Sequence, residues 1–136
     1  MHGARPIALA ALAVILAGCE TAPVKEFQEE IQNIFKPYGK AEENLEAGVR
    51  AYEDANYDQA SRLLQASLDE GLPRRTDRAR AHKYLAFIHC VSGRQGQCRE
   101  QFRQALTADS NFDLSPSEAG HPMWGPVFRN VKAQSQ

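Results

Sequence analysis

The chain has 136 residues and a formal net charge of −1. This near-neutral charge argues against a nucleic-acid-binding protein, because phosphate recognition requires a clear basic excess. The length suits one small domain with a single hydrophobic core. Regular alternation of apolar and polar residues is nearly absent, and Ala, Leu, Glu, Gln and Arg dominate, so an all-α fold is predicted.

Residues 1–18 have the features of a cleavable signal peptide. Arg5 gives a short positive start, and an uncharged run from Pro6 to Leu16 follows it. The run is shorter than the roughly 20 residues that a membrane-spanning helix needs, so it is typical of the apolar core of a signal sequence. It ends in Leu-Ala-Gly-Cys19, which resembles the bacterial lipobox, where a lipoprotein signal peptidase cuts before the cysteine.

The lipobox resemblance implies that Cys19 is the lipidation site. Its thiol would carry a diacylglyceryl group and its freed amine a further acyl chain such as palmitate, with the rest of the protein in the periplasm. Several acyl chains make membrane attachment practically permanent, whereas one chain anchors only marginally. Glu20 stands where aspartate would retain a lipoprotein in the inner membrane, so the outer membrane is favoured. The alternative is an ordinary secretory signal followed by an accidental cysteine.

Residues 19–40 are predicted to contain a first amphipathic helix, because apolar residues recur at helical spacing between Val24 and Lys36. The apolar positions are Phe27, Ile31, Ile34 and Phe35. The polar face of this helix is mixed rather than basic, which favours packing on the domain over a position on a membrane surface. We expect it to close one end of the fold.

Residues 41–109 contain an internal repeat. The small residues Gly48 and Ala86 and the large residues Leu64 and Phe102 recur at one constant spacing in two successive stretches. Such a pattern predicts two helical hairpins whose antiparallel helices approach closely at small residues. The small residues expected opposite Gly48 and Ala86 are Ala60 and Cys98. The four helices are expected over residues 41–54, 57–70, 77–92 and 95–108.

These two units resemble tetratricopeptide (TPR) repeats. Their spacing is a few residues longer than the roughly 34 of that repeat. The extra residues fit in the linker 71–78, where glycine and proline break the helix before a new N-cap at Thr76 or Asp77. Four positions depart from the usual residues of the repeat: Asn44, Ala51, His82 and His89.

The TPR resemblance implies that a partner segment binds the concave face lined by the first helix of each unit. The residues carried onto that face are Leu45, Val49, Tyr52, Arg80, Lys83 and Phe87. A mixed apolar and basic groove suits an amphipathic or acidic peptide. Because two units form only a short groove, we expect modest affinity. Five cations around the linker form a basic cluster: Arg74, Arg75, Arg78, Arg80 and Lys83. The alternative interpretation of this cluster is a solvated loop whose charge is neutralised by the acidic first unit.

Residues 110–136 are predicted to cap the repeats, since two repeats cannot bury both of their faces. A loop over residues 109–121 carries Phe112 and Leu114 as apolar plugs, and a last amphipathic helix is expected over about 122–133. Its apolar side comprises Trp124, Val127, Phe128 and Val131.

Cys90 and Cys98 lie at the facing ends of two predicted antiparallel helices. Since they are the pair left after Cys19, an oxidising compartment would allow a disulfide between them, worth roughly 2 to 3 kcal/mol. Two free buried cysteines are the alternative. His82 and His89 with these cysteines match no zinc motif, so no metal site is expected.

No nucleophile elbow, phosphate-binding glycine loop or Ser/His/Asp motif is visible in the sequence. Acidic pairs such as Glu42 with Glu43 are better explained as solvated helix faces than as a catalytic dyad. We therefore expect neither an enzyme nor a protein with a cofactor or small-molecule substrate.

The lipobox and the two repeats, together with two further stretches, resemble the TssQ family of type VI secretion-associated lipoproteins. The stretches are His82-Lys-Tyr-Leu-Ala-Phe-Ile-His-Cys90 and Gly120-His-Pro-Met-Trp-Gly-Pro-Val-Phe128. The resemblance implies an accessory envelope protein whose partner is a secretion-apparatus component. Two alternatives remain: an adaptor for outer-membrane protein insertion, pilus or peptidoglycan machinery, and a structural lipoprotein whose helices stabilise an oligomer.

Overall fold

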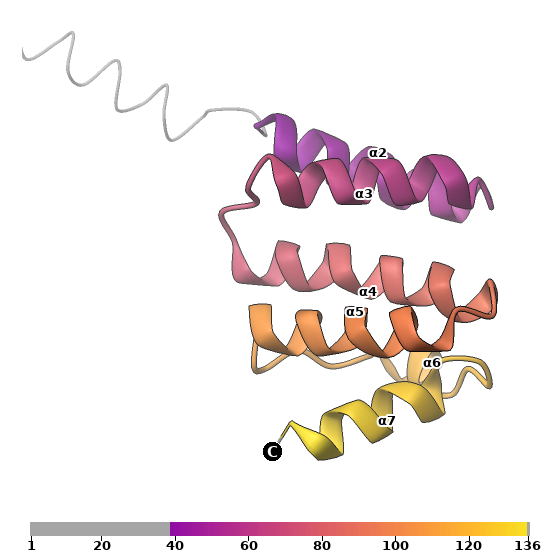
Figure 1. Ribbon diagram of the computed structural model, residues 1–136. Helices are drawn as coiled ribbons and strands as arrows, with labels where there is room; N and C mark the ends of the chain where they lie inside the picture. The colour runs from indigo at the N-terminus through magenta and orange to yellow at the C-terminus, as the bar shows by residue number, and fades with distance from the viewer. Residues whose placement is uncertain (1–38, 136) are drawn as a thin grey trace, which may run out of the picture. The chain divides into compact units, whose positions relative to one another are not determined.

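Helices make up all of the regular structure between residues 39 and 135, the part of the chain that the computed structural model describes. In this part, the predicted all-α class is confirmed. The helices are α2 (Lys40–Glu53), α3 (Tyr57–Asp69), α4 (Arg75–Val91), α5 (Gln95–Ala108), α6 (Pro116–Ala119) and α7 (Gly125–Gln134) (Figure 1). The predicted signal peptide 1–18, Cys19 and the predicted helix between residues 24 and 36 lie outside the described residues.

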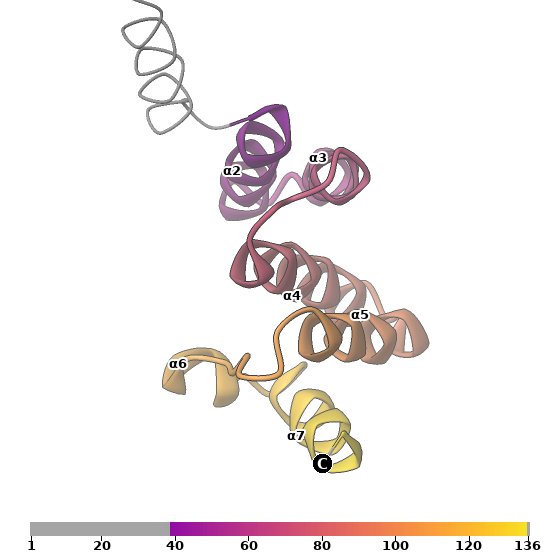
Figure 2. The ribbon, with the colours of Figure 1, turned by 90° about the vertical axis from the view of Figure 1, so that its left-hand side faces the viewer.

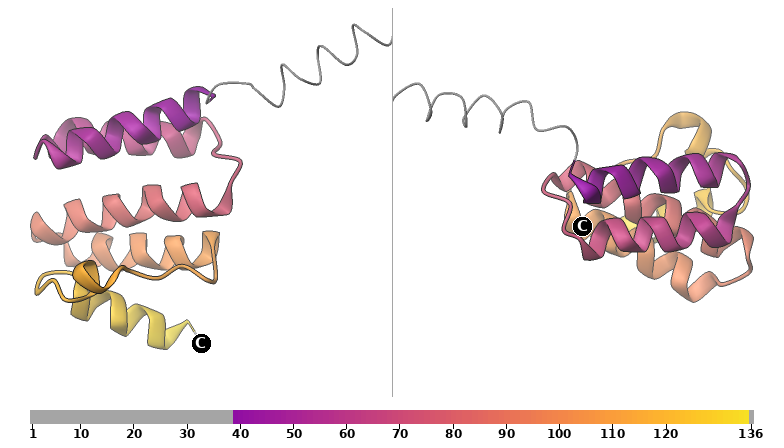
Figure 3. Two further views of the ribbon diagram at one scale, coloured as in Figure 1. Left: turned by 180° about the vertical axis from the view of Figure 1, so that it is seen from behind. Right: turned by 90° about the horizontal axis from the view of Figure 1, so that it is seen from above.

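The helices pair into two antiparallel hairpins, α2 with α3 and α4 with α5, and α3 packs on α4. The C-terminal helix α7 packs on α5, and the short α6 contacts α7. In a side view, α2, α4 and α6 follow one another along one side of the described residues, and α3, α5 and α7 along the other (Figure 2). The view from above shows α2 and α3 side by side (Figure 3). One face is therefore built from α2, α4 and α6.

The first hairpin closes tightly at Gly48. A Cβ atom at this position would lie 2.8 Å from Cγ of Leu64, so no larger residue fits without a shift of the neighbouring helix. The sequence pattern had placed Ala60 opposite Gly48, but the nearest side chain is that of Leu64, while Ala60 is fully buried on the same helix. Asn56 is the N-cap of α3, and its side chain accepts a hydrogen bond from the backbone N–H of Gln59 at 3.4 Å. This side-chain cap is the expected device for starting a helix after a tight turn.

The linker between the hairpins is held by side chains of α4. Arg78 donates hydrogen bonds to the carbonyl oxygens of Leu72 and Pro73 at 2.8 and 2.9 Å, and Leu72 is buried. The predicted N-cap at Thr76 or Asp77 is wrong, because α4 already begins at Arg75. Asp77 instead lies in the first turn, where its carboxylate accepts a hydrogen bond from Arg74. Its negative charge there interacts favourably with the positive end of the helix dipole.

Residues 109–124 differ from the predicted loop because they contain a helical turn, α6. Ser115 and Glu118 form a capping box around Pro116, which pre-sets the backbone of the first helical residue. The last helix begins at Gly125 rather than near residue 122. A Cβ atom on Gly125 would overlap the carbonyl oxygen of Ala119, so the close approach of α6 and α7 requires glycine there.

The core consists of two apolar clusters. One lies between the hairpins and includes Leu45, Val49, Leu64 and Leu85. The other joins α4, α5 and the C-terminal segment through the buried residues Phe87, Phe102, Leu114, Trp124, Phe128 and Val131. The predicted apolar side of the last helix is thus buried in the second cluster. Among the described helices, none is long and apolar enough to cross a membrane.

Candidate functional site

Three of the six residues predicted to contact a partner are core residues. Leu45, Val49 and Phe87 are 1%, 4% and 2% exposed, so their predicted exposure on a concave face is wrong. Leu45 and Val49 share a cluster with Leu85 of α4, because α2 packs on that helix. These side chains stabilise the fold and cannot contact a partner.

The burial of Phe87 follows from the C-terminal segment. The indole of Trp124 stacks on the Phe87 ring, with the ring centres 4.2 Å apart, and the imidazole of His121 stacks on the other side of the indole at 3.4 Å. The indole N–H donates a hydrogen bond to the carbonyl oxygen of Glu118 at 2.9 Å. This segment therefore covers part of the surface that the repeat pattern assigned to a partner.

Arg80 and Lys83 remain partly exposed, but each is paired with a carboxylate of a neighbouring helix. Arg80 donates hydrogen bonds to both carboxylate oxygens of Glu46 on α2, at 2.5 and 3.3 Å. Lys83 donates to Glu118 of α6 at 2.7 Å. The two cations are thus neutralised within the fold, which removes the electrostatic basis for a preference for acidic peptides.

The charges in these pairs are mutually stabilised. Burial on its own lowers the pKa of Arg80, but the hydrogen bond and charge of Glu46 outweigh it, so the pKa is raised. Burial on its own raises the pKa of Glu118, but hydrogen bonds from Lys83 and Ser115, with the charge of Lys83, lower it overall. Arg80 and Glu118 are therefore both stabilised in their charged forms.

Most of the predicted basic cluster has a structural role. Arg74 pairs with Asp77, and Arg78 binds the linker carbonyl groups. Together with the pairs of Arg80 and Lys83, these contacts explain four of the five cations. The alternative interpretation, neutralisation by nearby acidic residues, fits Arg80 through Glu46 of the first hairpin.

Three partly exposed tyrosines lie in contact with one another, and one of them, Tyr84, is close to both Arg80 and Lys83. Tyr52 of α2 contacts Tyr57, the first residue of α3, with ring centres 5.6 Å apart, and Tyr84 of α4 at 5.0 Å. Tyr57 is 37% exposed, and Tyr52 and Tyr84 are half-buried. We call Tyr52, Tyr57 and Tyr84 the tyrosine surface. Sequence reasoning identified only Tyr52, because the repeat pattern assigns neither of the other two to the binding face.

The hydroxyl groups of the tyrosine surface lie in a shared electrostatic environment. Burial, together with the nearby Tyr57, Tyr84 and Glu118, raises the pKa of Tyr52 to about 12. The hydroxyl therefore stays protonated at physiological pH and can donate a hydrogen bond. The ammonium group of Lys83 lies 4.7 Å from the centre of the Tyr84 ring, a cation–π distance. The tyrosine surface thus offers aromatic rings and, at Tyr52, a protonated hydroxyl group.

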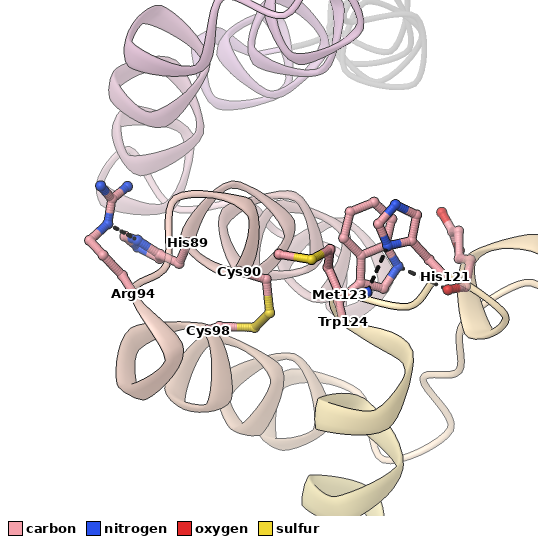
Figure 4. The surroundings of a disulfide bond; sticks show 8 residues. His89, Cys90, Arg94, Cys98, His121, Met123 and Trp124 are labelled. Carbon is pink, nitrogen blue, oxygen red and sulfur yellow. Dashed lines mark hydrogen bonds between the residues drawn. A yellow bond between two sulfur atoms is a disulfide. The ribbon is translucent and has the colours of Figure 1, made fainter.

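Cys90 and Cys98 form a disulfide, as predicted, with Cα atoms 5.1 Å apart (Figure 4). Both residues are fully buried, and the bridge joins the end of α4 to the start of α5. Beside it, the guanidinium of Arg94 donates a hydrogen bond to Nδ1 of His89 at 2.9 Å. The bridge fixes the closed end of the second hairpin.

The residues considered as zinc ligands take part in other contacts. The cysteines are in the disulfide, and Nδ1 of His82 lies 2.7 Å from the side-chain oxygen of Gln101. Within residues 39–135, no group of three or more His, Cys, Asp or Glu residues could hold a metal ion. Burial lowers the pKa of both His82 and His89, with Arg94 adding to the effect at His89.

An open hollow of about 260 Å³ lies where α2 ends and α3 begins. Its lining residues are Ala47, Arg50, Ala51, Asp54, Asn56, Gln59 and Leu63. In the described part of the chain, no buried side-chain polar atom lacks a hydrogen-bond partner. Nothing in this hollow therefore calls for a bound ligand, and the tyrosine surface is the stronger candidate site.

No protein-family model matches the chain, and no curated protein or solved structure matches it either. The functional inference therefore rests on the tyrosine surface, whose residues belong to α2, α3 and α4.

Proposed function

We propose that the protein is a non-enzymatic envelope adaptor that binds a segment of another protein at the tyrosine surface. The observation that carries the proposal is the grouping of three partly exposed tyrosines across α2, α3 and α4. Tyrosine suits partner binding because its large ring and its hydroxyl contribute apolar contact and hydrogen bonding at low entropy cost.

Two TPR-like units with a C-terminal cap are the finer fold that we propose for this adaptor. The close approach of Gly48 and Leu64 and the stacking of the α2–α3 hairpin on α4 support it. The packing of α7 on α5 supports the role of the C-terminal helix as a cap. In such an arrangement, the first helix of each unit faces the partner, which fits the positions of Tyr52 and Tyr84.

Lipidation of Cys19 is the proposed means of attachment, with the domain on the periplasmic side of the outer membrane. The lipobox sequence supports this. The resemblance to the TssQ family makes a component of a type VI secretion apparatus the proposed partner. Machinery for outer-membrane protein insertion, pilus assembly or peptidoglycan synthesis is the alternative source of a partner.

Site-specific photo-crosslinking in cells tests the adaptor proposal. A photoreactive phenylalanine at position 57 should form an adduct with a partner, because Tyr57 is the most exposed member of the tyrosine surface. The same residue at position 99, exposed on α5, serves as the matched control and should give none. Identification of a secretion-apparatus protein would support the proposed pathway, and insertion, pilus or peptidoglycan proteins would reassign it. Equal labelling from both positions, or none from position 57, would contradict the site.

Analysis of the N-terminus tests the anchor separately. The mature protein should begin at Cys19, carry acyl chains on that residue and fractionate with outer membranes. Cys19→Ser should release the protein into the soluble periplasmic fraction if the signal is still cleaved, or retain residues 1–18 if it is not. An unmodified Cys19 in the natural product would contradict lipid anchoring.

A further inference from the structure

We propose that the tyrosine surface binds an extended, proline-rich segment that is uncharged where it docks. This inference rests on the adaptor function and specifies the class of partner. It replaces the acidic or amphipathic peptide that the sequence alone suggested. Three features of the surface support it: the ring arrangement, the donor chemistry and the closed ion pairs.

The rings form a short aromatic series rather than an apolar groove for a helix. Tyr52 is central, with Tyr57 5.6 Å and Tyr84 5.0 Å away, and the ring planes are tilted by 40° and 62°. A polyproline II helix rises roughly 3.1 Å per residue, so two residues advance about as far as the 5.0 to 5.6 Å between neighbouring ring centres. Aromatic-lined surfaces of this kind recognise such segments, because the stiff conformation loses little entropy on docking.

The hydrogen-bonding groups of the tyrosine surface match a partner that presents acceptors. A polyproline II segment has no internal backbone hydrogen bonds, and proline lacks a backbone N–H, so the segment mainly offers carbonyl oxygens. Tyrosine hydroxyl groups can donate to those oxygens. Because Tyr52 titrates only at about pH 12, its hydroxyl retains the proton that this contact requires.

The charges around the rings favour an uncharged docking stretch. Arg80, which interacts with Tyr84, pairs with Glu46, and Lys83, 4.7 Å from the centre of the Tyr84 ring, pairs with Glu118. An acidic peptide would have to compete with these carboxylates for their cations, and a basic peptide would have to compete with the cations for the carboxylates. A neutral proline-rich segment requires neither exchange.

Fluorescence anisotropy with the full natural protein, purified in detergent, tests this partner class. The probe is a fluorescein-labelled peptide of Pro-Pro-Ala repeats. Peptides of equal length with alanine in place of proline, or with glutamate in place of alanine, are the comparisons. We expect saturable binding of the proline-rich probe, no binding of the alanine peptide and weaker binding of the acidic peptide.

Variants of the protein test whether the tyrosine surface is the site. Tyr57→Ala should weaken binding about tenfold or more, as expected for loss of an exposed aromatic ring that contacts the partner directly. Tyr84→Phe retains the ring and should weaken binding by about two- to tenfold through the lost hydroxyl. Arg99→Ala, on α5, is the matched control and should leave the affinity unchanged. Melting temperatures of all variants separate a local effect from loss of folding.

Several outcomes would overturn the inference. They are equal binding of the proline-rich and alanine peptides, no binding of the proline-rich probe, and unchanged affinity in Tyr57→Ala. If crosslinking from position 57 still captures a partner in cells, only the partner class is wrong. If that crosslink also fails, the adaptor site itself is wrong.

Discussion

Truncation of Trp124 should strongly destabilise the domain, although this residue lies outside both hairpins. The indole is 8% exposed, stacks on Phe87 at 4.2 Å and donates a hydrogen bond to the carbonyl oxygen of Glu118. Replacement of a buried tryptophan by alanine costs about 3 to 5 kcal/mol. Domains of this size have about 5 to 15 kcal/mol of stability, so Trp124→Ala should leave a marginal fold.

The free energy of unfolding is measured by urea titration, with far-ultraviolet circular dichroism as the signal. Fluorescence is unsuitable because Trp124 is the single tryptophan and its replacement removes that signal. Trp124→Phe keeps an aromatic ring but loses the N–H donor, and should cost about 1 to 2 kcal/mol. Met123→Ala is the matched control, because Met123 is 44% exposed and surface changes usually stay within about 0.5 kcal/mol. A loss below about 1 kcal/mol in Trp124→Ala would refute the packing of the C-terminal segment on α4.

Three further predictions concern the disulfide and two titrating groups. Cys98→Ala should lower the melting temperature in oxidising buffer by the equivalent of roughly 2 to 3 kcal/mol and much less under reductant, whereas equal loss in both buffers would show that the bridge contributes nothing. Because the pKa of Glu118 is lowered in the folded protein, its stabilising effect is present above pH 4.5 and is lost as the pH falls through the folded pKa. Acid titration of the unfolding free energy should therefore be shallower in Glu118→Gln, and identical curves would contradict the pairing with Lys83. The pKa of His82 is lowered below 6.5 in the folded protein, so the free energy of unfolding should decrease as the pH falls from 6.5 through the folded pKa. His82→Gln should reduce this decrease, and the part due to His89 should remain.

The helices of the hairpins were predictable because their signals are local. Glycine and proline in the 71–78 linker separate the hairpins, and the spacing of small and large residues predicted four helices close to their observed bounds. The start of α4 was missed because it uses no side-chain cap, so the polar residues Thr76 and Asp77 indicated a later start. Helix α6 was missed although Ser115 and Glu118 form a capping-box sequence, because a helix of one turn has no apolar periodicity.

The surface was less predictable, because exposure depends on contacts that are distant in the sequence. Phe87 was expected on a concave face, and only the packing of Trp124 explains its burial. Likewise, the partner of Arg80 is Glu46, 34 positions away, and the spacing of residues within one helix does not indicate such a pair. The amphipathic pattern identified which residues are apolar, but it did not distinguish a core position from a binding position.

The arrangement around α4 determines which groups on this face are available to another molecule. A carboxylate from α2 neutralises Arg80, and a carboxylate from α6 neutralises Lys83, so both cations are engaged within the fold. The apolar side chains that could have formed a helix-binding groove are buried between the hairpins or under Trp124. The tyrosine rings are then the groups that a partner can contact without separating an ion pair, although the Tyr84 hydroxyl already interacts with Arg80. A partner therefore does not need to displace the C-terminal segment. A ligand that binds the tyrosine surface should leave the contacts of Trp124 intact.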